Sequence, residues 1–194
     1  MYLSPTLYNK LIRPKFLVKK YIKKIIQNQF DFTGSNVLDF GCGTGSACFI
    51  FSPKNYLGID IDKKRIDFAK KSFPSYKFEV LNDNIIPAED GIFDFICIFA
   101  TIHHISDTVF KKYINEFKRV MKPSGAIIVI EPVISGKNKL NNWFMRIFDN
   151  GKYIRDESHY RSFFEDDFSV TIGMKFKKLF FYNELFFWAK RIKV

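Results

Sequence analysis

The chain has 194 residues, 47% of them hydrophobic, and carries a net charge of +11 from 31 basic and 20 acidic residues. This length suits one domain around a single core, and the hydrophobic share excludes a disordered chain. No apolar run approaches the roughly 20 residues of a membrane-spanning helix. Three cysteines are too few for a disulfide framework and match no zinc spacing, so we expect a cytoplasmic protein without a metal site.

The positive charge is spread along the chain. Its lysines are scattered, no arginine-rich strip occurs, and Lys, Asn, Ile and Phe are all frequent, as in proteins of AT-rich genomes. We therefore interpret the charge as a composition bias and expect no nucleic-acid partner.

Residues 15–29 show the spacing of an amphipathic helix. Apolar residues recur at positions 17, 18, 21, 22, 25 and 26, and lysines at 15, 19, 20, 23 and 24 lie off that stripe. Such a helix normally packs its stripe against its own domain. A basic amphipathic helix can also rest on an anionic membrane, so peripheral membrane contact stays open.

Strands and helices alternate through the middle of the chain. Buried strands are predicted at 36–40, 56–60, 77–81, 93–99 and 126–130, and helices at 62–72 and 108–121. This alternation predicts an α/β fold with a Rossmann-like, doubly wound and mostly parallel sheet. Farther on, helices are predicted at 136–149 and 157–165, and strands at 168–176 and 184–192 as an antiparallel hairpin at the edge of the sheet.

A glycine-rich loop follows the first strand. Asp39 precedes Gly41, Gly43 and Gly45, and we expect a helix directly after them. Glycines allow positive φ and a close approach of a ligand, and parallel sheets bind ligands at the carboxyl ends of their strands. The third glycine comes one residue too early for the dinucleotide fingerprint, which weighs against an NAD-dependent dehydrogenase. An amino-acid moiety, with its ammonium group near Asp39, suits the loop better.

Two more carboxylates lie at neighbouring strand ends. Asp60 ends the second strand, where a carboxylate can accept hydrogen bonds from both hydroxyls of a ribose. Asp83 follows the third strand and can bind the amino group of an adenine. Together with Asp39, these positions match the ammonium, ribose and adenine groups of S-adenosylmethionine (SAM).

In this order, the motifs resemble those of the class I SAM-dependent methyltransferases, of the small-molecule type similar to quinone-biosynthesis enzymes. The segments that carry the resemblance are 38–45, 58–62, 82–84, 93–96, 102–105 and 119–125, and Ser124 departs from the glycine usual there. The resemblance implies SAM as cofactor, with contacts from Asp39, Gly41, Cys42, Gly43, Gly45, Asp60, Ile61, Asp83, Asn84 and Phe99.

The implied reaction is methyl transfer to an O, N or C atom of a small-molecule or lipid-like acceptor, releasing S-adenosylhomocysteine (SAH). Two alternatives stay open: a SAM-binding protein without turnover, and a nucleic-acid-binding or nucleic-acid-modifying protein, which the charge suggests. The oligomeric state is not predicted.

Candidates for catalysis and acceptor binding come from two segments. His103 and His104 follow the fourth strand, and either can act as a general base or hold a backbone carbonyl. Tyr153, Arg155 and His159 lie beyond the fifth strand, where Arg155 can bind a carboxylate or phosphate of the acceptor.

We expect one methyltransferase domain over 1–194. It comprises an N-terminal helix (15–29), a cofactor-binding core (36–132), an insertion on the acceptor side (134–165) and the hairpin (168–192). Trp143, Phe144 and Phe148 of the insertion are expected either to pack in the core or to wall an apolar acceptor site, with Lys152 or Arg155 at its anionic end.

Overall fold

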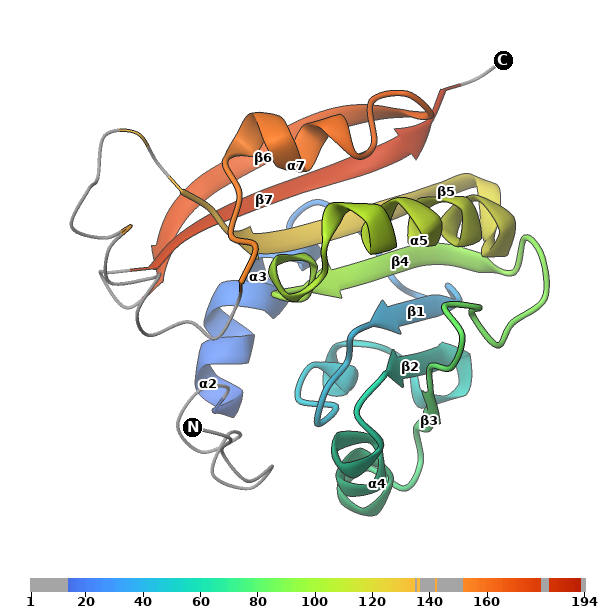
Figure 1. Ribbon diagram of the computed structural model, residues 1–194. Helices are drawn as coiled ribbons and strands as arrows, with labels where there is room; N and C mark the ends of the chain where they lie inside the picture. Colours follow the sequence, from blue (N-terminus) through green and yellow to red (C-terminus); the bar gives the residue numbers. More distant parts are fainter. Residues whose placement is uncertain (1–13, 135, 137–141, 143–151, 179–181, 193–194) are drawn as a thin grey trace.

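The computed structural model describes residues 14–134, 136, 142, 152–178 and 182–192 (Figure 1). One seven-stranded sheet has the order β3-β2-β1-β4-β5-β7-β6. Its strands are β1 (Val37–Phe40), β2 (Tyr56–Asp60), β3 (Lys77–Val80), β4 (Phe93–Phe99), β5 (Met121–Pro132), β6 (Phe168–Lys178) and β7 (Tyr182–Arg191). The first five are parallel, and β7 runs antiparallel between β5 and β6. The predicted fold class is confirmed, including the antiparallel hairpin.

Helices cover both faces of this sheet. Among the described residues they are α2 (Lys15–Val18), the π-helical η1 (Lys19–Lys23), α3 (Lys24–Gln27), α4 (Lys63–Ser72), α5 (Asp107–Val120) and α7 (Glu157–Ser162), with short 3-10 turns η2 (Cys48–Ile50), η3 (Pro53–Asn55) and η4 (Ile102–His104). In Figure 1, α5 and α7 lie in front of the sheet. The N-terminal helix, formed by α2, η1 and α3 in succession, packs on the other face together with α4.

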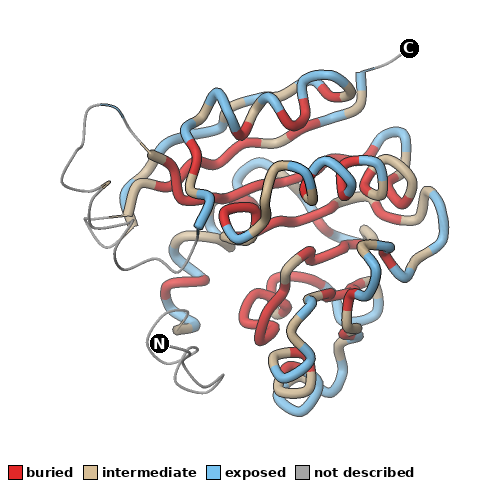
Figure 2. Tube along the Cα trace, in the orientation of Figure 1, coloured by how far each residue is buried: buried red, intermediate tan, exposed pale blue. Residues whose placement is uncertain are grey.

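Alternation along the strands divides the core into two layers. Leu38 and Phe40 of β1 pack with α5 and α7, whereas Val37 packs with the N-terminal helix and α4. Successive side chains of a strand point to opposite faces, so a strand that is apolar throughout must be covered on both. Figure 2 shows the result as buried tube along the central strands and exposed tube on the outer helix surfaces.

The segment after the glycine loop differs from our expectation. We predicted a helix directly after Gly45, but the chain forms only the three-residue turn η2. The turn ends at Phe51, which is already extended with ψ 162°, and Ser52 stays extended because the residue before a proline is driven out of the helical conformation. A ligand at this loop therefore meets individual N–H groups and not the N-terminus of a long helix.

Other predicted elements agree closely with the structure. Asp62 caps α4 by accepting hydrogen bonds from the backbone N–H groups of Lys64 and Arg65. The predicted helix at 136–149, with Trp143, Phe144 and Phe148, lies outside the described residues. Within the described ranges, no helix is both long and apolar enough to cross a membrane.

Phe117 of α5 is a direct test of the front layer. Its side chain is fully buried, and its ring centroid lies 5.0 Å from that of Phe40. Phe117→Ala should lower the free energy of unfolding by about 3–5 kcal/mol, because a large buried side chain leaves a cavity. Denaturant unfolding measures this, with Phe16→Ala as control, since Phe16 is 66% exposed. Equal losses for both variants would contradict the packing described.

Candidate functional site

The glycine loop lies at the carboxyl end of β1, and its glycines are needed there for two different reasons. Gly41 and Gly43 have φ +74° and +55°. A Cβ on Gly41 would lie 2.2 Å from Cγ2 of Thr101, so Gly41 is required for packing. A Cβ on Gly43 would meet nothing closer than 3.7 Å, the guanidinium of Arg65. At Gly43 the positive φ requires glycine and the neighbours do not, since a Cβ would be at ordinary contact distance, whereas Gly45 packs against the ring of Phe78.

Asp60 joins this loop to the end of β2. Its Oδ2 accepts a 2.8 Å hydrogen bond from the Gly43 N–H, and its Oδ1 accepts a 2.9 Å bond from the Asp62 N–H. Burial raises the pKa of Asp60 above its ordinary value, although both hydrogen bonds oppose the rise. The carboxylate is therefore held in one orientation beside the glycine loop.

Asp39 and Cys42 are buried beside the glycine loop. Asp39 is 2% exposed and accepts a 2.7 Å hydrogen bond from the Tyr56 hydroxyl. Cys42 is also buried, and burial together with the charges of Asp39 and Asp60 raises the pKa of its thiol. Their predicted contacts with a cofactor stay predictions.

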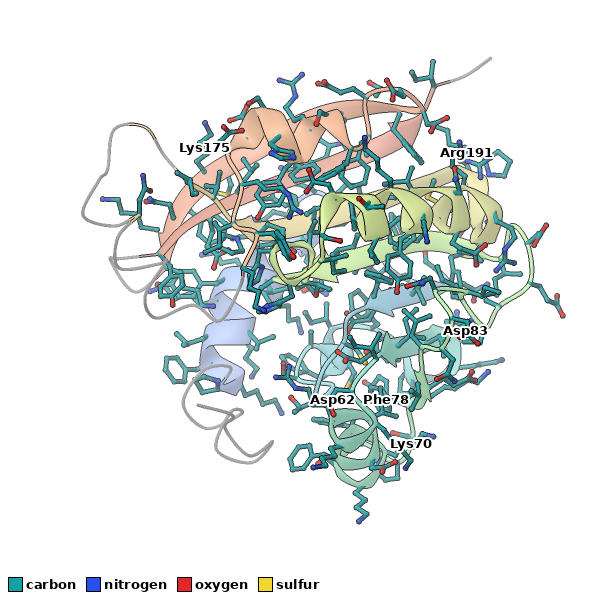
Figure 3. The ribbon with its side chains drawn as sticks, viewed as in Figure 1. Asp62, Lys70, Phe78, Asp83, Lys175 and Arg191 are labelled. Carbon is teal, nitrogen blue, oxygen red and sulfur yellow. The ribbon has the colours of Figure 1, made fainter. Side chains whose placement is uncertain are left out.

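The turn after β3 is strained and carries exposed apolar surface. Asp83 and Asn84 both have positive φ, 52° and 56°, a conformation that costs energy in residues other than glycine. The Asn84 side chain is fixed by a 2.8 Å hydrogen bond from the Tyr113 hydroxyl. Figure 3 shows Asp83 on this turn and Asp62 at the start of α4.

Two aliphatic side chains flank these strand ends. Ile61 follows β2 and is 74% exposed, and Ile85 follows the strained turn and is 62% exposed. Exposed branched side chains beside hydrogen-bonding groups suit the faces and edges of a planar ring. Ile85 was missed by the sequence analysis, although an isoleucine next to the polar run 82–84 is a signal that could have identified it.

The turn after β4 is organised by a carboxylate from β5. Glu131 is fully buried and accepts hydrogen bonds from the backbone N–H groups of Thr101 (2.6 Å) and Ile102 (2.7 Å). A longer bond of 3.3 Å comes from the N–H of His103, whose Nδ1 lies 2.7 Å from the same carboxylate. The sequence analysis missed Glu131; its only signal was a charge ending the apolar strand 126–130.

The two histidines have different environments. His103 is 2% exposed, and because Glu131 already accepts backbone N–H groups, Nδ1 of His103 donates its proton to that carboxylate. His104 is exposed, with its ring centroid 4.0 Å from that of His103. With Nδ1 of His103 engaged, the predicted general-base role stays a prediction for Nε2 of His103 and for the ring of His104.

Arg155 binds the chain itself with its whole guanidinium group. Nε and Nη2 donate to Oδ1 of Asp107, Nη1 donates to the carbonyls of Ile102 and Tyr153, and Nη2 also donates to that of Ile105. All five N–H donors are engaged, and the side chain is 4% exposed. The predicted contact of Arg155 with an anionic acceptor therefore lacks a donor, and the geometry makes Arg155 a positioning residue.

His159 and Tyr153 belong to the same cluster. Nε2 of His159 lies 2.7 Å from Oδ2 of Asp107, and the Tyr153 N–H donates to the carbonyl of His103. Partial burial raises the pKa of Asp107, but the hydrogen bonds from Arg155 and His159 outweigh it, so this pKa is lowered. The structure thus brings the predicted catalytic and acceptor-side segments together.

Among the described residues, no group of three or more His, Cys, Asp and Glu side chains could hold a metal ion.

Known proteins resemble this chain in both sequence and fold. The family model that matches residues 31–177 is described as a methyltransferase domain. Demethylmenaquinone methyltransferase of Lactococcus lactis is 30% identical over 118 residues, covering 56% of this chain and 46% of that protein. The Staphylococcus saprophyticus enzyme of the same name is 23% identical, covering 84% and 75%. The chain thus spans less than half of the Lactococcus protein.

The fold is shared with a solved SAM-dependent methyltransferase from Archaeoglobus fulgidus. Its TM-score is 0.74 at 16% identity, over 96% of this chain and 98% of that one. Together with the sheet order, this likeness defines a class I methyltransferase fold. Because the family match covers more than half of its residues, the chain belongs to the methyltransferase domain family.

The positioning role of Arg155 leads to a test of stability. Arg155→Lys should lower the free energy of unfolding by about 2–4 kcal/mol, because one ammonium group cannot satisfy the three carbonyls and the carboxylate. Affinity for SAH should stay unchanged. Arg161→Lys is the matched control, since Arg161 is 40% exposed and pairs with Glu157 and Glu165 at the surface. Denaturant unfolding that finds the two variants equally stable would contradict this role.

Proposed function

We propose that this chain is a SAM-dependent methyltransferase that binds SAM along the carboxyl ends of β1, β2 and β3. The observation that carries the proposal is the carboxylate of Asp60 at the end of β2, which is held in one orientation against the backbone N–H of Gly43 in the glycine loop. A phosphate-bearing ligand fits less well, because a buried carboxylate repels it and η2 offers no long helix N-terminus.

The residues present fit the parts of SAM. Asp60 would accept hydrogen bonds from the ribose hydroxyls, and the loop Gly41–Gly45 would border the amino-acid moiety. Asp83 and the backbone of Asn84 would meet the edge of the adenine ring, while Ile61 and Ile85 would pack against its faces. The strain at Asp83 and Asn84 supports this assignment, since such conformations cluster at ligand sites. Asp39 would act on the ammonium group from beneath the loop, together with Cys42 and Phe99 as packing residues.

When bound, SAM supplies an electrophilic methyl group. The chain's own contribution is to hold an acceptor in line with that group and to exclude water, which can provide much of the rate acceleration. The turn that Glu131 orders adjoins the loop through the contact of Thr101 with Gly41. His103 and His104 lie on this turn, where either can take a proton from an acceptor hydroxyl or amine.

We further propose a small-molecule or lipid-like acceptor. Two relatives are named demethylmenaquinone methyltransferase and norajmaline N-methyltransferase, and both names describe small organic acceptors. Neither name assigns an O, N or C target to this chain.

A cytoplasmic enzyme with a lipid-like acceptor can also rest on a membrane. Lys15, Lys19, Lys20 and Lys24 are exposed on the N-terminal helix, beside Phe16, which is 66% exposed. Each basic residue near an anionic surface contributes about 1 kcal/mol. At low salt, the protein should sediment together with phosphatidylserine vesicles. The double variant Lys19→Glu/Lys20→Glu should stay in the supernatant. Equal sedimentation with neutral vesicles would rule out this contact.

Calorimetry with SAH tests the cofactor site. Asp60→Asn should bind SAH about tenfold to hundredfold more weakly, because hydrogen bonds to a charged acceptor are replaced by bonds to a neutral one. Since only the ionised carboxylate accepts both ribose hydroxyls well, wild-type affinity should fall as the pH drops through the raised pKa of Asp60. The variant should lack this decline.

Asp67→Asn serves as the control, since Asp67 lies on the exposed surface of α4 and pairs with Lys63. If wild type and Asp60→Asn bind SAH equally at neutral pH, Asp60 does not contact the ribose. If wild type binds no SAH at all, the proposed function fails.

His103→Asn separates catalysis from structure. The Asn amide takes the place of Nδ1 and can still donate to Glu131, so folding and SAH affinity should be largely retained, whereas a base role predicts a loss of methyl transfer of about 100-fold or more. His104→Gln is measured beside it. Full turnover by both variants on a confirmed acceptor would show that neither ring acts as the base.

A further inference from the structure

The strained turn after β3 is closed by one hydrogen bond of its own. The Ile85 N–H donates this bond, of 3.2 Å, to the Asn82 carbonyl. The two central residues, Asp83 and Asn84, both have positive φ, as in a type I′ turn. Because the closing bond uses the N–H of Ile85, the N–H groups of Asp83 and Asn84 take no part in it. The turn can therefore offer backbone donors to a ligand.

Tyr113 of α5 reaches this turn from the front layer. Its hydroxyl donates a 2.8 Å hydrogen bond to Oδ1 of Asn84. The side chain is 3% exposed, and its ring lies edge-on to that of Phe40 in β1, with the centroids 4.7 Å apart. Burial raises the pKa of Tyr113, so the hydroxyl keeps the proton that it donates. A tightly packed ring thus fixes the side chain of a residue whose backbone conformation is unfavourable.

A second anchor on α5 lies one helical turn farther along. Oε2 of Glu116 accepts a 2.8 Å hydrogen bond from the Ile86 N–H, and Nη2 of Arg119 donates a 2.9 Å bond to the Ile86 carbonyl. Nη1 of Arg119 also donates to the Ala88 carbonyl. Ile85, which is 62% exposed, is thereby held between two neighbours that are both bound to α5.

The anchored turn is also tied to the end of β2. The Leu81 N–H, just before the turn, donates a 2.9 Å hydrogen bond to the Asp60 carbonyl. In the proposed cofactor site, Asp60 meets the ribose and the turn meets the adenine ring. Because covalent bonds fix the distance between a ribose and its adenine, a turn held relative to Asp60 can form both sets of contacts at once.

We propose that Tyr113 is a positioning residue for the adenine ring of the cofactor and acts through the side chain of Asn84. This inference rests on the proposed function and adds to it a residue from a separate helix. The Tyr113 hydroxyl holds the turn in the conformation in which the Asn84 N–H can donate to a ring nitrogen and Asp83 can accept from the adenine amino group. Without the hydroxyl, the turn relaxes when no ligand is bound, and binding must restore the strained conformation.

This role predicts an effect on specificity as well as on affinity. S-inosylhomocysteine carries hypoxanthine in place of the adenine of SAH, with an oxygen in the position of the amino group and a proton on the adjacent ring nitrogen. The Asp83 carboxylate repels that oxygen, and the Asn84 N–H meets another donor. A turn that is held in place therefore distinguishes SAH from S-inosylhomocysteine, whereas a relaxed turn distinguishes them less.

Tyr113→Phe removes the hydroxyl and keeps the packed ring. In calorimetry, wild type should bind SAH at least about thirtyfold more tightly than S-inosylhomocysteine, because the wrong base leaves polar groups unpaired. Tyr113→Phe should weaken SAH binding about tenfold and S-inosylhomocysteine binding less than about twofold, so the ratio of the two affinities falls about fivefold or more. An unchanged ratio overturns the proposal, even if both affinities fall, because a general loss of stability weakens both ligands alike. Equal binding of both ligands by wild type also overturns it.

Tyr76→Phe is the matched control. The Tyr76 hydroxyl donates a 3.2 Å hydrogen bond to the Phe51 carbonyl, so the same group is removed. Tyr76 precedes β3, however, and lies at the end of that strand opposite to the turn. This variant should keep the affinity ratio of wild type.

Asn84→Gly separates positioning from packing. Glycine adopts positive φ without strain and has no side chain for the hydroxyl to hold, so Tyr113→Phe should not lower the affinity ratio further in the Asn84→Gly background. A fall as large as that in wild type overturns the proposal. If Tyr113→Phe fails to fold, Asn84→Ala removes the accepting oxygen instead, and an unchanged ratio in that variant overturns the proposal. Wild type that binds neither ligand contradicts the proposed function itself, so the two failures are distinguishable.

Discussion

The buried carboxylate of Glu131 is the interaction on which the site depends. By accepting the N–H groups of Thr101 and Ile102, it fixes the turn that leaves β4. That turn presses Thr101 against Gly41 and offers carbonyls to Arg155, so one charge aligns the glycine loop, the histidines and the segment 153–155. An isolated buried carboxylate would be costly, and here several donors compensate it. The same bonds that stabilise the charge therefore build the site.

Successive side chains of β5 point to opposite faces of the sheet, so the carboxyl end of this strand meets two chemically different environments. Glu131 points to the layer of α5 and α7, where backbone donors surround it. Glu184 lies opposite Pro132, the residue after Glu131, and therefore belongs to the other face, where it lines a small pocket beneath the N-terminal helix. Two glutamates at one edge thus serve separate purposes, one in ordering a turn and one in lining a pocket.

Much of the fold could be predicted from the sequence, because strands such as 93–99 and the helix cap at Asp62 depend on local pattern. The neighbouring parallel strands β2 and β3 were also predicted correctly, so Asp60 and the turn with Asp83 follow adjacent strands. The helix predicted after Gly45 was wrong, because the chain leaves the helical conformation already at Phe51, where the local sequence has no helix-breaking residue. Glu131, Glu184 and the full engagement of Arg155 depend on contacts between residues up to about fifty positions apart, which local spacing does not encode.

The three cysteines show a further consequence of the way the layers close. Cys42, Cys48 and Cys97 are all free and buried beside the loop, and burial raises the pKa of each thiol, that of Cys48 to about 12. Only thiolates react readily with alkylating reagents, so the folded chain protects all three. Each becomes reactive only when the layer between the N-terminal helix and the sheet opens. The rate of thiol labelling therefore measures how often this layer opens in the folded protein.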